Sequence, residues 1–211
     1  MASIENISPA VIKRISRELQ KLQQQPPEGI KLIVNEDNIT DVQAWIMGPE
    51  GTPYEGGNFR IKIVLGADFP NAPPKCYFIT KLFHPNVSAT GEVCVNTLKK
   101  DWKKELGIAH ILLTVKCLLI YPNPESALNE EAGRLLLEQY EDYAKHARLM
   151  TSIHAAGQKV DFGGAGAKKV EAEVNGGLCV VEKVVVTEVS SKRVVDKKSK
   201  VTDKKKTLRR L

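Results

Sequence analysis

The stretch that most constrains the fold is the apolar run GIAHILLTVKCLLIY at residues 107–121. Its apolar residues fall on more than one side of a helix, so a helix formed here needs cover on more than one face. We therefore expect it to pack centrally against a sheet. The prolines at 122 and 124 end this helix, since neither can continue it. Cys117 lies within the helix and is expected to pack there, because free cysteine is among the most buried residue types.

Four segments have the composition of antiparallel strands that are joined by short polar turns. They are residues 30–34, 42–48, 59–65 and 76–80. Between the second and the third, GPEGTPYEGG has the glycine and proline density of a tight, exposed connection. The fold class expected is α+β, with a four-stranded antiparallel meander flanked by helices.

Two further helical regions flank these strands. Ser8 and Pro9 predict a helix start, with serine as the cap and proline at the first helical position. Asn129 is expected to cap a later helix, whose first-turn glutamates would complement the positive end of the helix dipole. One long helix, or two, then runs to about residue 155. Its expected inward positions are Leu135, Leu136, Tyr140, Tyr143 and Leu149.

The four cysteines are scattered and form no Cys-x-x-Cys pair. This pattern indicates reduced thiols, as in the cytoplasm and nucleus, and argues against a disulfide framework or a metal site. The chain has no apolar run of about eighteen residues, so we expect no membrane partner. Its first twenty residues also lack the pattern of a secretory signal.

The net charge of +6 is unevenly distributed. Residues 156–211 hold 14 lysines and arginines against 7 acidic residues, whereas residues 1–155 hold 17 against 18. We therefore predict a folded core domain over residues 1–155 and a flexible basic extension over 156–211. Within the extension, the valine-rich segment that begins at Leu178 is expected to have no strand partner.

The extension ends in Leu208, Arg209, Arg210 and Leu211. Two apolar anchors and two guanidiniums form a short motif that an acidic groove on a partner protein can bind. A solvated tail that aids solubility, a nuclear-import signal or a nucleic-acid patch are the alternatives. Nucleic-acid binding would weaken steeply with added salt, and we expect no nucleic-acid partner.

The segment KLFHPNVSATGEVCVN carries the candidate chemistry. Pro85 has a fixed φ and disfavours helical geometry at His84, so a rigid turn presents Asn86. A polar loop then leads to Cys94, eight residues further on. Taken alone, each of these residues is more often structural: a buried thiol, a turn residue or a satisfied imidazole.

Taken together, His-Pro-Asn, the polar loop, Gly-x-x-Cys-Val-Asn and Trp102 resemble the active site of the ubiquitin-conjugating enzymes. GPEGTPYEGG also fits a turn of that family, and the resemblance covers residues 8 to about 150. It implies the ubiquitin-conjugating (UBC) fold, with Cys94 carrying ubiquitin as a thioester. Asn86, supported by His84 and Pro85, would steady the loop and the oxyanion.

In this family, the segment after Pro-Asn-Pro borders the cysteine and often supplies an acidic residue that orients and deprotonates the acceptor lysine. Ser126 stands near the position where many relatives have aspartate, so that role would pass to Glu130. The resemblance implies no bound cofactor, since ATP is used by the upstream activating enzyme. The implied partners are donor and acceptor ubiquitin, that activating enzyme and a ubiquitin ligase.

Two loops depart from the common family pattern. FPNAPP lacks the aromatic residue before its proline pair, and DWKKELG lacks the usual Ser-Pro-Ala after the tryptophan. RING-type ligases usually grip these loops. With the Leu-Arg-Arg-Leu end, the departures resemble the branch that elongates lysine-eleven-linked ubiquitin chains with the anaphase-promoting complex in cell-cycle protein degradation.

Three other functions remain open. The chain could conjugate another ubiquitin-like protein on the same fold, or it could be a catalytically silent binding module. The presence of Cys94 argues against the silent module. A papain-like hydrolase is disfavoured because no histidine falls at a recognisable spacing for a Cys-His pair.

Overall fold

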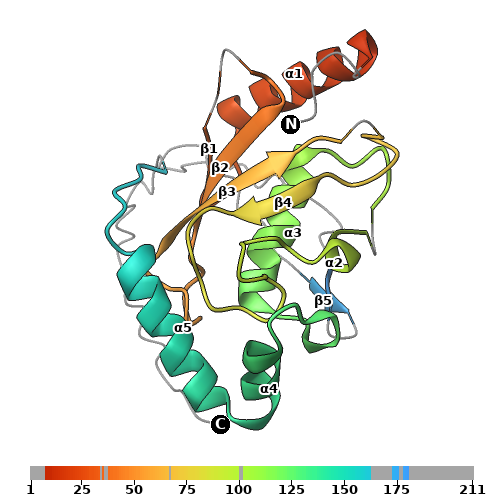
Figure 1. Cartoon of the computed structure of the whole chain (residues 1–211). Helices are drawn as coiled ribbons and strands as arrows, with labels where there is room; N and C mark the ends of the chain where they lie inside the picture. Colours follow the sequence, from red (N-terminus) through yellow and green to blue (C-terminus); the bar gives the residue numbers. More distant parts are fainter. Residues whose placement is uncertain are drawn as a thin grey trace, which may run out of the picture.

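The computed structural model contains a four-stranded antiparallel sheet with helices around it (Figure 1). The structure describes residues 8–33, 35, 38–66, 68–99, 102–162, 173–175 and 178–180. The strands are β1 (Ile30–Ile33), β2 (Asp41–Met47), β3 (Asn58–Val64) and β4 (Lys75–Phe78). They lie in the order β1-β2-β3-β4, so each strand pairs with its sequence neighbour. The predicted meander is confirmed.

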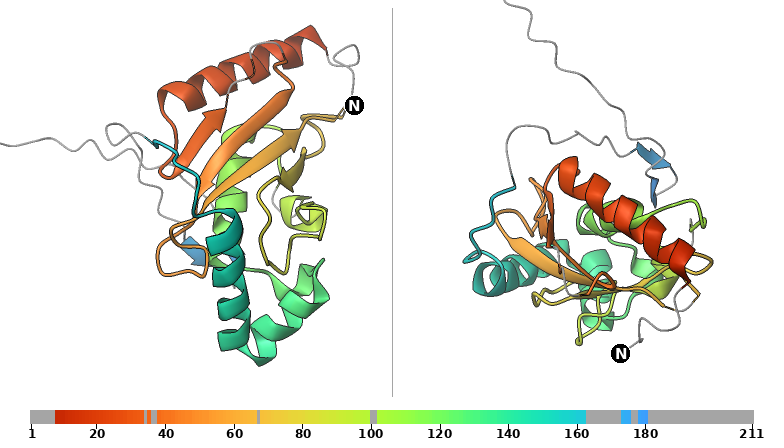
Figure 2. Two further views of the ribbon diagram at one scale, coloured as in Figure 1. Left: turned by 60° about the vertical axis from the view of Figure 1, so that its left-hand side comes forward. Right: turned by 90° about the horizontal axis from the view of Figure 1, so that it is seen from above.

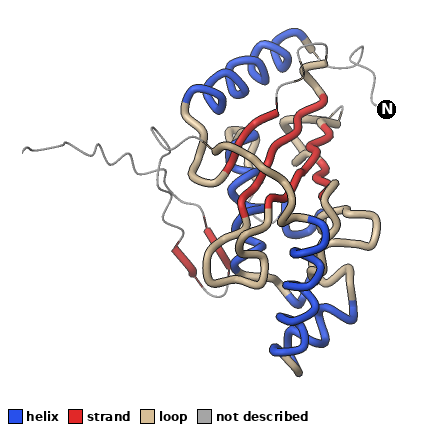
Figure 3. Tube along the Cα trace, turned by 90° about the vertical axis from the view of Figure 1, so that its left-hand side faces the viewer, coloured by secondary structure: helices blue, strands red, loops and turns tan. Residues whose placement is uncertain are grey.

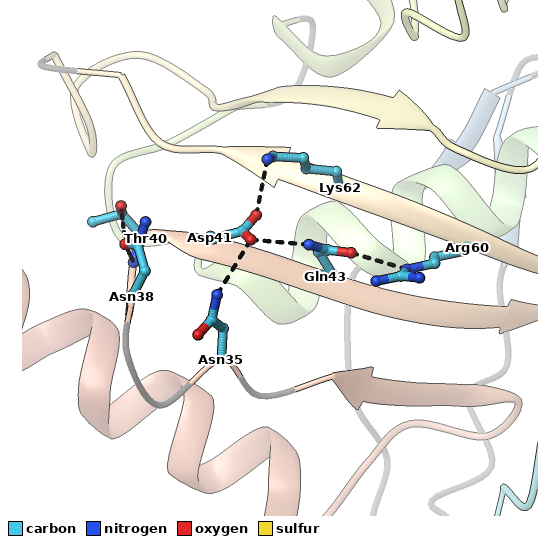
Figure 4. A network of polar contacts seen from close by, with 7 residues as sticks. All are labelled: Asn35, Asn38, Thr40, Asp41, Gln43, Arg60 and Lys62. Carbon is cyan, nitrogen blue, oxygen red and sulfur yellow. Dashed lines mark hydrogen bonds and ion pairs between the residues drawn. The ribbon is translucent and has the colours of Figure 1, made fainter. Parts of the chain in front are cut away.

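The two faces of the sheet differ because residues alternate along each strand. The inner face is apolar, and the register places Ala44 opposite Ile61 and Ile61 opposite Phe78. The outer face carries a polar network (Figure 4). There Asp41 accepts hydrogen bonds from Lys62 at 3.0 Å and from Gln43 at 3.0 Å. Burial alone would raise the pKa of Asp41, but these hydrogen bonds outweigh it and lower the pKa.

The central helix is α3 (Ile108–Ile120), which packs against the inner face of the sheet (Figure 2). This confirms the prediction made from its all-round apolar character. Helix α1 (Pro9–Gln24) begins with Pro9 after Ser8, whose side chain accepts a hydrogen bond from the Val11 N–H. Two short elements, α2 (Val95–Lys99) and the 3-10 turn η2 (Pro124–Ser126), flank α3 in the sequence.

Two helices, α4 (Glu130–Glu138) and α5 (Tyr140–His154), follow the central helix. Asn129 caps α4 as predicted, accepting from the Ala132 N–H at 3.1 Å. Between the helices, Gln139 has φ −145° and ψ 66°, which changes the direction of the chain. The buried positions of α5 therefore cannot be predicted by continuing the helical repeat of α4.

The break accounts for one of the two predicted inward positions that were wrong, Leu149. Leu135 and Tyr143 are buried as expected, and Leu136 is half-buried. Tyr140 and Leu149, however, are 50% and 56% exposed. Both belong to α5, whose buried face is formed by Tyr143, Ala144, Ala147 and Thr151. Leu149 lies off that face, whereas Tyr140 lies in line with it but is the first residue of the helix.

The expectation that the valine-rich segment has no strand partner is also wrong. Strands β5 (Glu173–Asn175) and β6 (Leu178–Val180) pair antiparallel, with Val174 opposite Cys179. The sequence between them is Gly-Gly, a composition typical of two-residue hairpin turns. Across the described ranges, helices long and apolar enough to cross a membrane are absent.

The two loops that depart from the family pattern are joined to each other. The indole N–H of Trp102 donates to the Pro70 carbonyl at 2.9 Å, and its ring lies 6.0 Å from that of Phe69. The peptide bond between Phe69 and Pro70 is cis. These contacts hold the two loops together as one surface.

Candidate active site

His84 anchors the site from beneath. It is fully buried, and its Nδ1 accepts the Asn86 N–H at 3.0 Å. Since Nδ1 is an acceptor, the ring proton lies on Nε2, which donates to the Leu118 carbonyl of α3 at 2.9 Å. Burial lowers the pKa of His84 to about 4, although the Leu118 carbonyl acts in the opposite direction. This neutral imidazole uses both nitrogens for structure and has none left to act as a base.

The pKa of His84 predicts how stability depends on pH. In the unfolded chain its pKa is near 6.5, and in the folded chain it is about 4. Between these values only the unfolded chain binds the proton, so the free energy of unfolding falls as the pH drops through this window. The full loss from this group is about 3 kcal/mol. Urea unfolding at a series of pH values measures it.

The matched control is His84→Gln, whose side chain can accept and donate hydrogen bonds but does not titrate. Carboxylates also titrate as the pH falls, so the informative quantity is the difference in the free energy of unfolding between the wild type and His84→Gln at each pH. We expect a steeper loss of stability in the wild type between pH 6.5 and 4. Parallel curves would show that His84 does not sense pH in this way.

Asn86 holds the segment that follows α3. Its side-chain amide donates to the carbonyls of Asn123 at 2.6 Å and Ser126 at 3.0 Å, and its Oδ1 accepts the Asn123 N–H at 2.8 Å. The residue is fully buried. Both of its side-chain donors therefore bind loop carbonyls in this conformation, and its part in stabilising an oxyanion stays a prediction.

Pro85 extends the same connection through its main chain. Its carbonyl accepts two hydrogen bonds, from the N–H groups of Leu128 at 2.8 Å and Asn129 at 3.0 Å. Together with the three contacts of Asn86, five hydrogen bonds join residues 85–86 to residues 123–129. The loop between α3 and α4 is thus held against the His-Pro-Asn turn.

Cys94 lies next to the His-Pro-Asn turn. Its N–H donates to the Asn86 carbonyl at 2.9 Å, and Val87 bridges Val93, so the polar loop closes on itself. Gly91 makes the closure possible, since its φ is +87° and a Cβ there would lie 2.2 Å from the Phe78 carbonyl oxygen. Cys94 is 5% exposed and stands immediately before α2.

A buried pair of tyrosines backs the site. The hydroxyl of Tyr54 donates to the Phe83 carbonyl at 2.8 Å and lies 2.7 Å from the hydroxyl of Tyr143 on α5. Burial raises the pKa of Tyr143 to about 12, so both hydroxyls stay protonated and available for these bonds. These two hydrogen bonds connect the turn at residues 48–57 to helix α5 and to Phe83, the residue before His84.

The structure thus gathers three predicted segments into one region: His84 to Asn86, Cys94, and the stretch that holds Ser126 and Glu130. Ser126 reaches Asn86 through its carbonyl. Glu130 is the exposed first residue of α4 and follows Asn129, which is bonded to Pro85. The predicted tail residues, Leu208 to Leu211, lie outside the described residues.

Asn123 is a site residue that the sequence reasoning missed. It offers Asn86 both a main-chain N–H and a carbonyl, and its own side chain accepts from the Glu125 N–H at 3.0 Å. The signal was present in the Pro-Asn-Pro stretch, which was interpreted only as a helix end. Asn123 lies between two prolines, whose fixed φ angles stiffen the chain on both sides of it, and this suits it to receive fixed hydrogen bonds.

The comparisons with known proteins agree with this geometry. The sequence profile described as ubiquitin-conjugating enzyme matches residues 14–151. "Ubiquitin-conjugating enzyme E2 S-B" of Xenopus laevis is 69% identical over 156 residues, which cover 74% of each chain. "Ubiquitin-conjugating enzyme E2 S" of Drosophila melanogaster is 54% identical over 212 residues, which cover 100% of this chain and 98% of its own. The protein of that name from Drosophila ananassae is 62% identical over 168 residues, or 80% of each chain.

Proposed function

This chain belongs to the ubiquitin-conjugating enzyme family, and we propose that it carries ubiquitin as a thioester on Cys94 and transfers it to lysine. The observation that supports this most directly is the hydrogen bond from the Cys94 N–H to the Asn86 carbonyl. The Asn86 side chain in turn binds the loop at residues 123–129. A thiol held beside a rigid turn has what a nucleophilic acyl carrier requires.

The two chemical steps place different demands on the site. Exchange of one thioester for another needs the thiolate of Cys94, and it needs no histidine base because a thiol replaces a thiol. Transfer to lysine needs a neutral amine, and an exposed lysine with a pKa near 10.4 is almost wholly protonated. We assign to Glu130 and Ser126 the roles of orienting the amine and accepting its proton. In support, the Ser126 carbonyl binds Asn86, and Glu130 follows Asn129, whose N–H binds Pro85.

The proposal is tested by incubation with ubiquitin, ATP and the activating enzyme, followed by a non-reducing gel. A thiol-sensitive adduct one ubiquitin heavier is expected. If ubiquitin gives no adduct but another ubiquitin-like protein does, the chain conjugates that protein instead. Failure with every such protein would favour a silent binding module.

We further propose that the chain elongates lysine-eleven-linked ubiquitin chains together with the anaphase-promoting complex, in the cytoplasm and nucleus. Two features support this. The joined loops of Pro70 and Trp102 lack the residues through which RING-type ligases usually bind the family, so another attachment is needed. The Leu-Arg-Arg-Leu end offers one, because paired guanidiniums and apolar anchors suit an acidic groove.

Removing residues 208–211 should leave thioester loading unchanged and weaken ligase-dependent chain growth. Loading depends on the core, whereas recruitment would lose two charge-assisted contacts and two apolar anchors. A loss of about 3 kcal/mol or more is expected, which corresponds to a hundredfold or larger rise in the ligase concentration needed. Chain growth titrated with purified ligase measures it.

The matched control exchanges Arg209 and Arg210 for lysines, which keeps the charge but not the bidentate geometry. An intermediate defect is expected. Equal chain growth with and without the last four residues would contradict recruitment through this end.

A further inference from the structure

The outer face of α3 carries apolar side chains that are buried although they point away from the sheet. At 100° per residue, Ile108, Leu112 and Leu119 share the face toward the sheet and are at most 1% exposed. Leu113 and Cys117 lie one turn apart on the opposite face, yet they are only 5% and 7% exposed. Another part of the chain must cover them.

The β5–β6 hairpin lies next to this face of α3. Strand β6 runs alongside α3. The view from above in Figure 2 and the tube in Figure 3 both place the hairpin on the side of α3 away from the sheet. Helix α1 meets α3 elsewhere, at its N-terminal end, where Glu18 accepts the Ile108 N–H at 2.8 Å. The sheet, α3 and the hairpin are therefore three successive layers.

The covered face adjoins the site of Cys94. The Leu118 carbonyl of α3 binds His84, and the loop that follows α3 is bonded to Pro85 and Asn86. Apolar residues that are not covered extend the surface around the end of α3. They are Ile120, Tyr121 and Leu128, with exposures of 36%, 45% and 45%. A folded protein attached to the Cys94 sulfur lies within reach of this apolar surface, which gains stability when it is buried.

We propose that the β5–β6 hairpin occupies the outer face of α3 in the free enzyme and that ubiquitin carried on Cys94 displaces it. This inference rests on the proposed function. A hairpin with strands of three residues is marginal by itself, so its contact with α3 is what holds it in place. The extension thereby restrains ubiquitin transfer until the hairpin leaves.

The expected size of the restraint follows from the populations. If the hairpin occupies α3 in about nine molecules of ten, about one in ten is competent, and removing the hairpin raises the transfer rate about tenfold. The same occupancy slows the chemical labelling of a side chain beneath the hairpin by about tenfold. Both quantities can be measured on the full chain.

The first experiment needs no ubiquitin. Residues 173–180 are replaced by glycine and serine at equal length, and the alkylation rate of Cys117 is followed by peptide mass spectrometry. We expect it to rise about tenfold, while Cys76, which is fully buried in the sheet, stays unreactive. The matched control replaces residues 188–195 of the same extension and should leave Cys117 unchanged. An unchanged Cys117 rate in the hairpin variant would overturn the proposal.

The second experiment follows a single turnover, the discharge of ubiquitin from Cys94 to free lysine. The hairpin variant should discharge about tenfold faster than the wild type and the control. Faster labelling of Cys117 with an unchanged discharge rate would overturn the competition with ubiquitin while leaving the proposed function intact. If no ubiquitin thioester forms at all, the proposed function falls and the competition falls with it.

Discussion

Replacing Cys94 with alanine is expected to abolish the ubiquitin adduct, and Cys94→Ser is expected to give an adduct that survives reducing agent. An oxyester forms where the thioester would have formed, and thiols do not cleave it under conditions that cleave a thioester. Because serine differs from cysteine by one atom, the fold around the Asn86 carbonyl is retained. A pair of gels, reducing and non-reducing, distinguishes the three proteins.

Cys117→Ser serves as the control for this result and should load ubiquitin like the wild type. Cys76 is a poor rival for the acceptor role, since burial raises the pKa of its thiol to about 12 and keeps it protonated at neutral pH. A thiol-sensitive adduct that persists in Cys94→Ala would assign the carrier role to another cysteine.

Asn86→Ala is expected to lower the discharge rate of the loaded enzyme by about 10² to 10³, the usual effect of removing one oxyanion donor. Loading itself should be much less affected, because thioester exchange does not depend on lysine placement. The substitution also removes three hydrogen bonds to the loop at residues 123–126. Single-turnover discharge to free lysine, at saturating lysine, measures the effect.

Two further variants separate the oxyanion role from loop support. Asn86→Asp keeps an acceptor for the Asn123 N–H but loses both donors. Asn123→Ala keeps the main-chain groups that Asn86 binds, so it should discharge at a near-normal rate. Normal discharge by Asn86→Ala would refute both roles. If a second substitution that restores the loop at residues 123–126 also restored discharge in Asn86→Ala, only the loop-support role of Asn86 would remain.

Local signals in the sequence were enough to predict most of the fold. Ser8 and Asn129 cap helices where the sequence places them, because a side-chain oxygen next to free N–H groups is a purely local arrangement. The four strands also form as expected, since alternation along a strand records which side is buried. The grouping of Asn86 with Cys94 followed from a motif of short range.

Contacts between distant segments were harder to predict. The hydrogen bond between Tyr54 and Tyr143 joins residues 89 positions apart, and no local sequence pattern predicts it. Leu149 was misplaced because the break at Gln139 shifts the buried face of α5. The five-residue helix α2 is too short to show a period, and β6 pairs with β5 inside the stretch that was predicted as a flexible extension.

The way Ser126 meets Asn86 has an evolutionary consequence. The contact uses the Ser126 carbonyl, which every amino acid possesses, so the side chain at this position can vary without loosening the loop. Neighbouring Asn123 likewise contributes main-chain groups. Mutation can thus exchange serine for aspartate or another residue there while the contact with Asn86 is kept. The backbone contact that fixes the loop therefore places no demand on the side chain at residue 126.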